Sequence, residues 1–300
     1  MYVGAMSAAS KLRILPGFVA FLLPWLLQAA WALLLVVWLG GLDELSRTLG
    51  MAGPSVHRII GLSGASTVGL SLVLFYLGAG RSVPLVVPGV FAMVPWWLGV
   101  AGALRGLRTV VETLASLPPD ERRPMLMQGM GEVMCLRLFG AWSCSALLVA
   151  TAGALFLAGL LQRRTSETGE ELARPPPQAR MNEAVVVAML ALVAWLAAFH
   201  SLIQSEFYSA AGETDQVRRE LFLAAVAGQL RTLGMLALGA RVALLLAFLA
   251  LGRRQLARRP REARVLGSLA LVSLLVVGTL WADAQPRERM YDALEQLPPR

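Results

Sequence analysis

Seven stretches of this chain are long and apolar enough to cross a lipid bilayer, and they decide what it can fold into. A crossing helix needs roughly 20 predominantly apolar residues. Six of the seven contain no Asp, Glu, Lys or Arg, and the remaining one contains only Arg241. The alternating pattern of a membrane β-barrel is absent. We therefore expect an all-α, polytopic transmembrane helical bundle with spans at Gly17–Gly40, Ile59–Gly80, Ser82–Leu104, Leu138–Gln162, Ala184–Ser205, Thr232–Gly252 and Val265–Ala282.

The composition excludes the other broad classes of protein. Apolar residues make up 57% of the 300 residues and charged residues 15%, which is too apolar for a soluble domain or a disordered chain. The first apolar run follows Lys11 and Arg13 but continues through Trp38, which is too long for a cleaved signal peptide. We expect a single integral membrane domain over residues 1–300, with a Pro-rich inner linker at 163–183.

The distribution of basic residues predicts the orientation, because cytoplasmic loops of membrane proteins carry an excess of Lys and Arg. With the N-terminus inside, the inner segments carry 13 basic and 5 acidic residues, whereas the outer segments carry 13 basic and 14 acidic residues. The net charge of +8 is thereby explained without a nucleic-acid partner. We expect a bacterial-type inner (plasma) membrane, with the N-terminus cytoplasmic and the C-terminus, Asp283–Arg300, outside.

The segments outside the expected spans are short. The longest is an outer loop over Arg105–Arg137, in which Leu117–Asp120, with its two prolines, predicts a turn followed by the start of a helix. We expect no segment to form a separate soluble domain with its own core.

Short patterns recur along the chain and suggest repeated helical hairpins. Arg137-Leu-Phe-Gly140 and Arg231-Thr-Leu-Gly234 begin 94 residues apart. A hairpin over residues 82–162 could then have a second copy over residues 184–252, as in many membrane folds built from repeats. The simpler interpretation is that Arg at a helix end and Trp near an interface are common in any membrane protein.

One hairpin carries two glycine-rich runs. The first is Gly99-Val-Ala-Gly102-Ala-Leu-Arg-Gly106, and the second extends from Gly129 to Gly140 and includes Glu132. Over Trp97–Leu161 the chain resembles the second and third transmembrane helices of the MotA/TolQ/ExbB proton-channel family.

The resemblance implies helices packed through Gly99, Gly102, Gly106 and Gly140, since small residues let helix backbones approach closely. In that family a ring of subunits surrounds a partner's helix, and proton flow moves the partner. The two family threonines correspond here to Ala103 and Arg137, and neither side chain relays a proton. The resemblance thus implies a divergent subunit or scaffold of a proton-driven or envelope-spanning complex.

Glu132 and Arg137 are the first candidates for an ion pathway or an assembly contact. If the fourth helix extends back to Met125, both enter the membrane. The alternative is a solvated helix end with Arg137 at the interface, and we favour this second interpretation.

Arg241 is the third candidate, because a bare Arg at the bilayer centre costs on the order of 3 kcal/mol on insertion scales. It could contact an ion or substrate, or it could be a buried structural residue. A helix over Leu221–Gly252 would instead place Arg241 near the inner surface. The structural interpretations are favoured.

No other group of residues indicates a catalytic or metal-binding site. The two histidines, His57 and His200, and the two cysteines, Cys135 and Cys144, suggest no metal site, haem site or disulfide, and no catalytic motif is present. We expect no cofactor and no enzyme activity. The expected partners are the bilayer and other membrane subunits or further copies of the chain. The alternative function is a small transporter or channel built from hairpins, and a lipid-modifying enzyme ranks below both.

Overall fold

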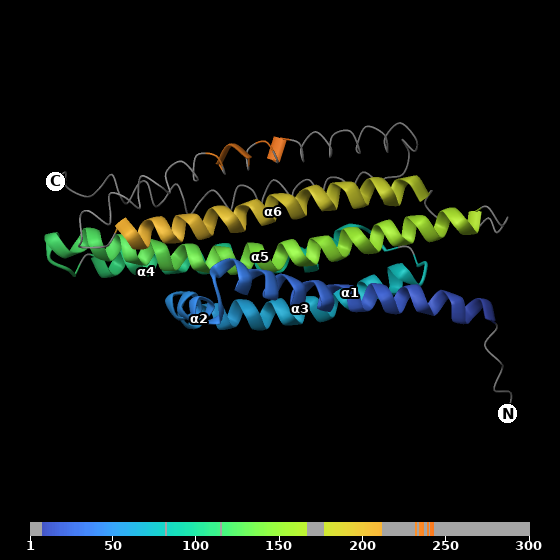
Figure 1. Cartoon of the computed structure of the whole chain (residues 1–300), viewed down its shortest axis with the longest axis horizontal. Coiled ribbons are helices and arrows are strands. Elements are labelled where there is room, and N and C mark those ends of the chain that lie inside the picture. Colours follow the sequence, from blue (N-terminus) through green and yellow to red (C-terminus); the bar gives the residue numbers. More distant parts are fainter. Residues whose placement is uncertain are drawn as a thin grey trace, which may run out of the picture.

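The computed structural model describes residues 8–81, 83–114, 116–166 and 177–211, together with residues 232, 234–236, 239, 241 and 242. The described part of the chain is all-helical (Figure 1). Its helices are α1 (Ala8–Leu39), α2 (Leu42–Met51), α3 (Pro54–Gly78), α4 (Val86–Leu114), α5 (Pro119–Ser166) and α6 (Pro177–Ala211).

Five of these helices, α1 and α3 to α6, are long and apolar enough to cross a membrane. Each coincides with one of the first five predicted spans, so the protein has the elements of a multi-pass membrane bundle. The two further predicted spans, Thr232–Gly252 and Val265–Ala282, lie outside the described residues apart from isolated positions of the first. The predicted second hairpin copy, 184–252, is described mainly through its first helix.

Helix α5 lies at the centre of the bundle. It packs most extensively against α6 and α4 and also contacts α1 and α3, and the ribbon shows these long helices side by side (Figure 1). Within the apolar windows of the spans, 61% of the α5 residues are buried, against 17% for α1. Helix α1 is therefore peripheral, and its exposed Leu, Val, Phe and Trp side chains form a surface suited to lipid.

A proline inside α4 is compensated by a neighbouring helix. Pro95 has no backbone N–H, so it cannot bond the carbonyl of Phe91 one turn earlier. The Ser66 hydroxyl of α3 donates a hydrogen bond to that carbonyl. This pairing fixes α3 against α4 at a point where an unpaired carbonyl would otherwise face the apolar interior.

The segment Arg105–Arg137, expected between two spans, is mostly helical. Helix α4 continues to Leu114 and α5 begins at Pro119, with a short turn between them. The predicted turn and helix start at Pro119 are confirmed. With 48 residues and a rise of 1.5 Å per residue, α5 is about 72 Å long, more than twice the roughly 30 Å of a bilayer's hydrocarbon core.

The extended ends of α4, α5 and α6 share a second cluster of buried hydrophobic side chains. We call residues 103–114, 119–136 and 204–208 the helical arm. In Figure 1 the α4–α5 end of this arm projects beyond α2. Its buried side chains are Ala103, Leu107, Leu114, Leu126, Met127, Met130, Val133, Met134 and Tyr208.

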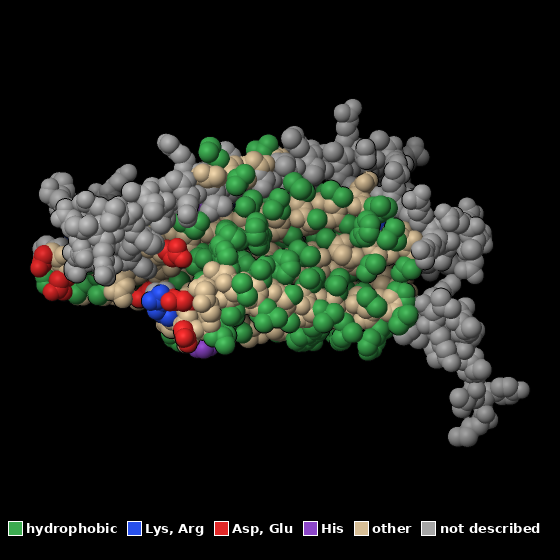
Figure 2. Space-filling model, in the orientation of Figure 1, with side chains coloured by type: hydrophobic (Ala, Val, Ile, Leu, Met, Phe, Trp, Pro, Cys, Tyr) green, Lys and Arg blue, Asp and Glu red, His purple; other side chains and the backbone are tan. Residues whose placement is uncertain are grey.

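The short helix α2 lies across the end of α1 and α3. Glycines with positive φ stand on both sides of it, at Gly40 and Gly41 (φ 90° and 137°) and at Gly53 (φ 65°), a conformation that other residues rarely adopt. On the face drawn in Figure 2, hydrophobic side chains cover the middle, while acidic and basic side chains gather toward the end that carries α2 and the arm. This pattern matches a bilayer band bordered by a polar interface.

Candidate functional site

The four glycines predicted to pack helices all lie at the interface between α4 and α5. A Cβ at Gly140 would lie 2.6 Å from the Pro95 carbonyl oxygen and 2.8 Å from the Gly99 Cα. A Cβ at Gly99 would lie 2.9 Å from the Leu136 carbonyl oxygen. The two backbones therefore touch, and no side chain fits at either position without separating the helices. Gly102 and Gly106 continue the contact with looser spacing.

Arg137 lies inside the protein. Only 1% of it is exposed, and its Nη1 is 3.5 Å from the sulfur of Met134. The favoured interpretation of a solvated helix end is thus wrong, because α5 does not begin near Arg137 but continues back to Pro119. The residue sits at the base of the helical arm, beside the glycine contact.

Glu132 has a different environment from Arg137. It is only partly buried, and its Oε1 accepts a hydrogen bond of 3.4 Å from Gln128 Nε2 on the arm. Glu132 therefore reaches the surface of the arm, whereas Arg137 is enclosed by protein.

A polar seam, which we define as Cys135, His200, Ser201, Gln204 and Ser205, runs between α5 and α6 next to the base of the arm. All five side chains are buried. The Ser205 hydroxyl lies 3.1 Å from the Cys135 sulfur and donates to the Gly131 carbonyl at 3.0 Å. These contacts join α6 to α5. Sequence reasoning missed the seam, although polar residues recurring every three to four positions near the end of an apolar span are its visible signal.

An aromatic cluster ties α1 to the same region. Trp38 of α1 stacks on Trp142 of α5 with ring centroids 6.0 Å apart, and it contacts Phe199 of α6 at 3.6 Å. The indole N–H of Trp142 donates to the Trp31 carbonyl at 2.9 Å, and that of Trp31 donates to the Ser145 hydroxyl at 2.8 Å. The indoles of Trp31 and Trp142 thus have partners, and helices distant in sequence are fixed together.

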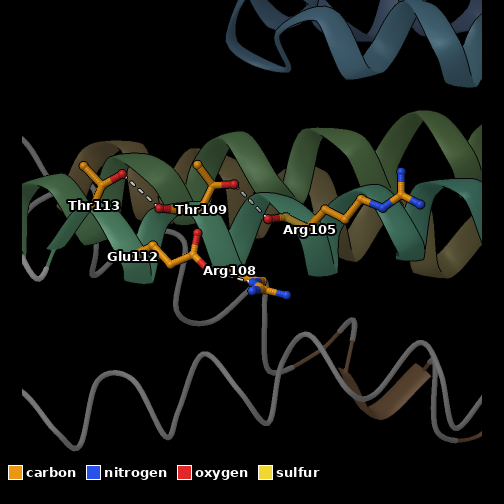
Figure 3. A network of polar contacts seen from close by, with 5 residues as sticks. All are labelled: Arg105, Arg108, Thr109, Glu112 and Thr113. Carbon is orange, nitrogen blue, oxygen red and sulfur yellow. Dashed lines mark hydrogen bonds and ion pairs between the residues drawn. The ribbon is translucent and has the colours of Figure 1, made fainter.

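On the arm, α4 presents a row of side chains along one face. Leu104, Leu107, Arg108, Val111 and Glu112 line a groove of about 330 Å³. Figure 3 shows the Arg108 and Glu112 side chains meeting on this helix, with Nε and Oε1 2.7 Å apart. The hydroxyls of Thr109 and Thr113 bond carbonyls of their own helix (Figure 3).

Arg241 is partly buried, and most of the chain around it lies outside the described residues. Its predicted roles therefore stay predictions. Within the described residues, no group of three or more His, Cys, Asp and Glu side chains is placed to hold a metal ion. Cys135 and Cys144 are both free and buried.

Comparison of the chain with protein-family models, with curated proteins and with solved structures finds no match. The resemblance to the MotA/TolQ/ExbB family stays a prediction from the sequence.

Proposed function

We propose that the protein is a membrane-embedded subunit or scaffold of a proton-driven or envelope-spanning complex, a divergent relative of MotA/TolQ/ExbB subunits. The observation that carries the proposal is the burial of Arg137, with 1% of the residue exposed. A cation that faces protein cannot line a water-filled path through its own subunit. It serves instead as a structural residue at the junction of the arm and the membrane core.

The helical arm supports the same function. Since α5 is about 72 Å long, it extends well beyond the hydrocarbon core, and the arm keeps its own buried side chains there. A rigid extension with its own core offers a surface to partners outside the bilayer. From the charge distribution of the sequence, we expect this end on the outer side of an inner membrane.

The proposed role predicts that loss of Arg137 disturbs the junction of the arm and the membrane core, and through it the attachment of partner subunits to the arm. The test is mass spectrometry of the complex extracted in mild detergent, with Arg137→Ala compared with Arg123→Ala, an exposed arginine on the same helix. We expect partner subunits to be lost from the first variant and retained by the second. Equal composition of the two complexes, with wild-type helicity by circular dichroism, would contradict the proposal.

A small transporter or channel is the second candidate, and the buried polar seam between α5 and α6 is the observation that favours it. A transport pathway through this region would make flux depend on the acidic and basic candidates. The test is proton flux in vesicles that contain the purified protein. Flux that Glu132→Gln abolishes without loss of folded protein would establish the channel and remove the scaffold as the main function.

A further inference from the structure

The outward face of α4 forms a continuous row that passes from the membrane core into the arm. Ala101, Leu104, Arg108 and Val111 follow one another at intervals of three or four residues, and Glu112 lies four residues after Arg108, which places all five on one side of the helix. We call these five residues the α4 stripe. Ala101 is exposed, Val111 is 45% exposed, and the groove described above lies along the part of the stripe in the arm.

The chemistry of the α4 stripe changes along its length. The part nearer the membrane core offers Ala101, a small residue that lets another helix approach closely, and Leu104, which is partly buried against the core. The part farther out offers Arg108 and Glu112, whose side chains are 80% and 61% exposed. An apolar seam flanked by charges of both signs is the pattern by which parallel helices choose their partners.

We propose that the partner of the α4 stripe is the same stripe of a second copy of this chain, packed in parallel about a two-fold axis along the membrane normal. The proposal rests on the proposed function, since it names one partner of the scaffold. Copies of one membrane protein share one orientation, so their α4 helices run parallel at the same depth.

The stripe is self-complementary in charge under this symmetry. Arg108 and Glu112 are four residues apart, an offset of about 6 Å along the helix axis that an arginine side chain can span. Two copies therefore form two equivalent pairs, Arg108 of each with Glu112 of the other. A guanidinium has five N–H donors, so Arg108 can keep its own Glu112 and also bind that of the second copy.

The test uses disulfide cross-linking of the full chain in native membranes. Both natural cysteines are 0% exposed, so a cysteine introduced at Val111 reports its own surroundings. The matched control is Met125→Cys, which is 39% exposed on α5 of the same arm. We expect Val111→Cys chains to form dimers about tenfold more than Met125→Cys chains, the ratio that a preference of about 1.4 kcal/mol gives.

Charge reversal separates contacts between copies from contacts within one helix. Both single variants are made in the Val111→Cys background. In a dimer of either variant, Arg108→Glu or Glu112→Arg, both pairs between the copies then carry like charges, and each variant should form about tenfold fewer dimers. Co-expression of the two reversed chains restores opposite charges at both pairs, although each helix keeps its internal repulsion. Recovery of the mixed dimer is therefore expected.

Three results would overturn the proposal: dimers no more frequent than in the Met125→Cys control, no recovery on mixing, or cross-links from Val111→Cys to a different protein. The last result would leave the scaffold function intact, because it identifies another partner. Conversely, if α4 dimers form and Arg137→Ala retains its partner subunits, this inference stands and the proposed role of Arg137 is refuted.

Discussion

Replacing Gly140 with alanine adds one methyl group where the backbones of α4 and α5 touch. The new Cβ would lie 2.6 Å from the Pro95 oxygen, whereas ordinary contact begins at 3.4 Å, so relief requires a local separation of about 0.8 Å. The atoms in the way belong to the backbone of α4 and cannot rotate aside. A gap of this size forfeits a quarter to a half of the dispersion energy of each affected contact.

The magnitude follows from two opposing terms. Overpacking of this kind costs about 1–3 kcal/mol, and lost contacts along the helix pair add to it. Against this, alanine has a better intrinsic helix propensity than glycine by about 1 kcal/mol. These two terms together lower the free energy of unfolding of Gly140→Ala by about 0–2 kcal/mol, and the lost contacts increase that loss.

Gly61 of α3 is the matched control, because a Cβ there meets nothing within 4 Å. Gly61→Ala keeps only the propensity term, so we expect a change between zero and about 1 kcal/mol of stabilisation. The assay is equilibrium unfolding in mixed micelles titrated with sodium dodecyl sulfate and followed by circular dichroism. If Gly140→Ala unfolds at the same detergent fraction as Gly61→Ala or above it, the close contact of α4 and α5 does not exist as described.

Three further outcomes are expected from the same structure. Ser66→Ala leaves the Phe91 carbonyl without its partner from α3 and should destabilise the protein by about 1–3 kcal/mol in the same unfolding assay. Glu183→Gln leaves the buried Arg180 guanidinium, 3.0 Å away, without a counter-charge, and we expect a loss of about 1–3 kcal/mol. Reporter tags placed in Arg253–Arg264 should be labelled only after cells are permeabilised, because this basic segment is predicted to be cytoplasmic.

Each of these outcomes has its own control. Thr67→Ala removes a hydroxyl that bonds the Ser63 carbonyl of its own helix, and it should cost less than Ser66→Ala. Glu44→Gln breaks an exposed pair with Arg47 and should leave stability nearly unchanged. Equal effects of Ser66→Ala and Thr67→Ala would refute the role given to the bond between α3 and α4. Equal effects of Glu183→Gln and Glu44→Gln would refute the argument from burial, and labelling of Arg253–Arg264 in intact cells would reverse the orientation.

The sequence predicted the parts of the fold that depend on lipid as solvent. Uninterrupted apolar runs identified five helices, and the prolines at 118 and 119 located the start of α5. The glycine spacing pointed to the α4–α5 contact, because only small residues permit it. Hydropathy could not show that α5 continues through Asp120–Arg137, since a helix beyond the bilayer needs no uniform apolar pattern.

The candidate site was harder to predict because it depends on tertiary packing. Arg137 follows a charged stretch and precedes an apolar one, which is the pattern of an interface residue in a single helix. Its burial requires neighbouring helices that extend past the bilayer with it. The contact between Trp38, Trp142 and Phe199 likewise joins three helices, and no local spacing in the chain relates them.

Helix α5 also has a mechanical consequence. Residues Met125–Ser166 contain no proline and form one continuous helix through both the arm and the membrane core. A force applied to the arm is therefore transmitted along a rigid helix into the membrane core. A lateral displacement of one end of α5 would move its other end in the opposite direction, because the helix would rotate about its contact with α4 at Gly99 and Gly140. Spin labels placed near the two ends of α5 would show opposite movements if the helix transmits the force. They would show independent movements if the helix bends.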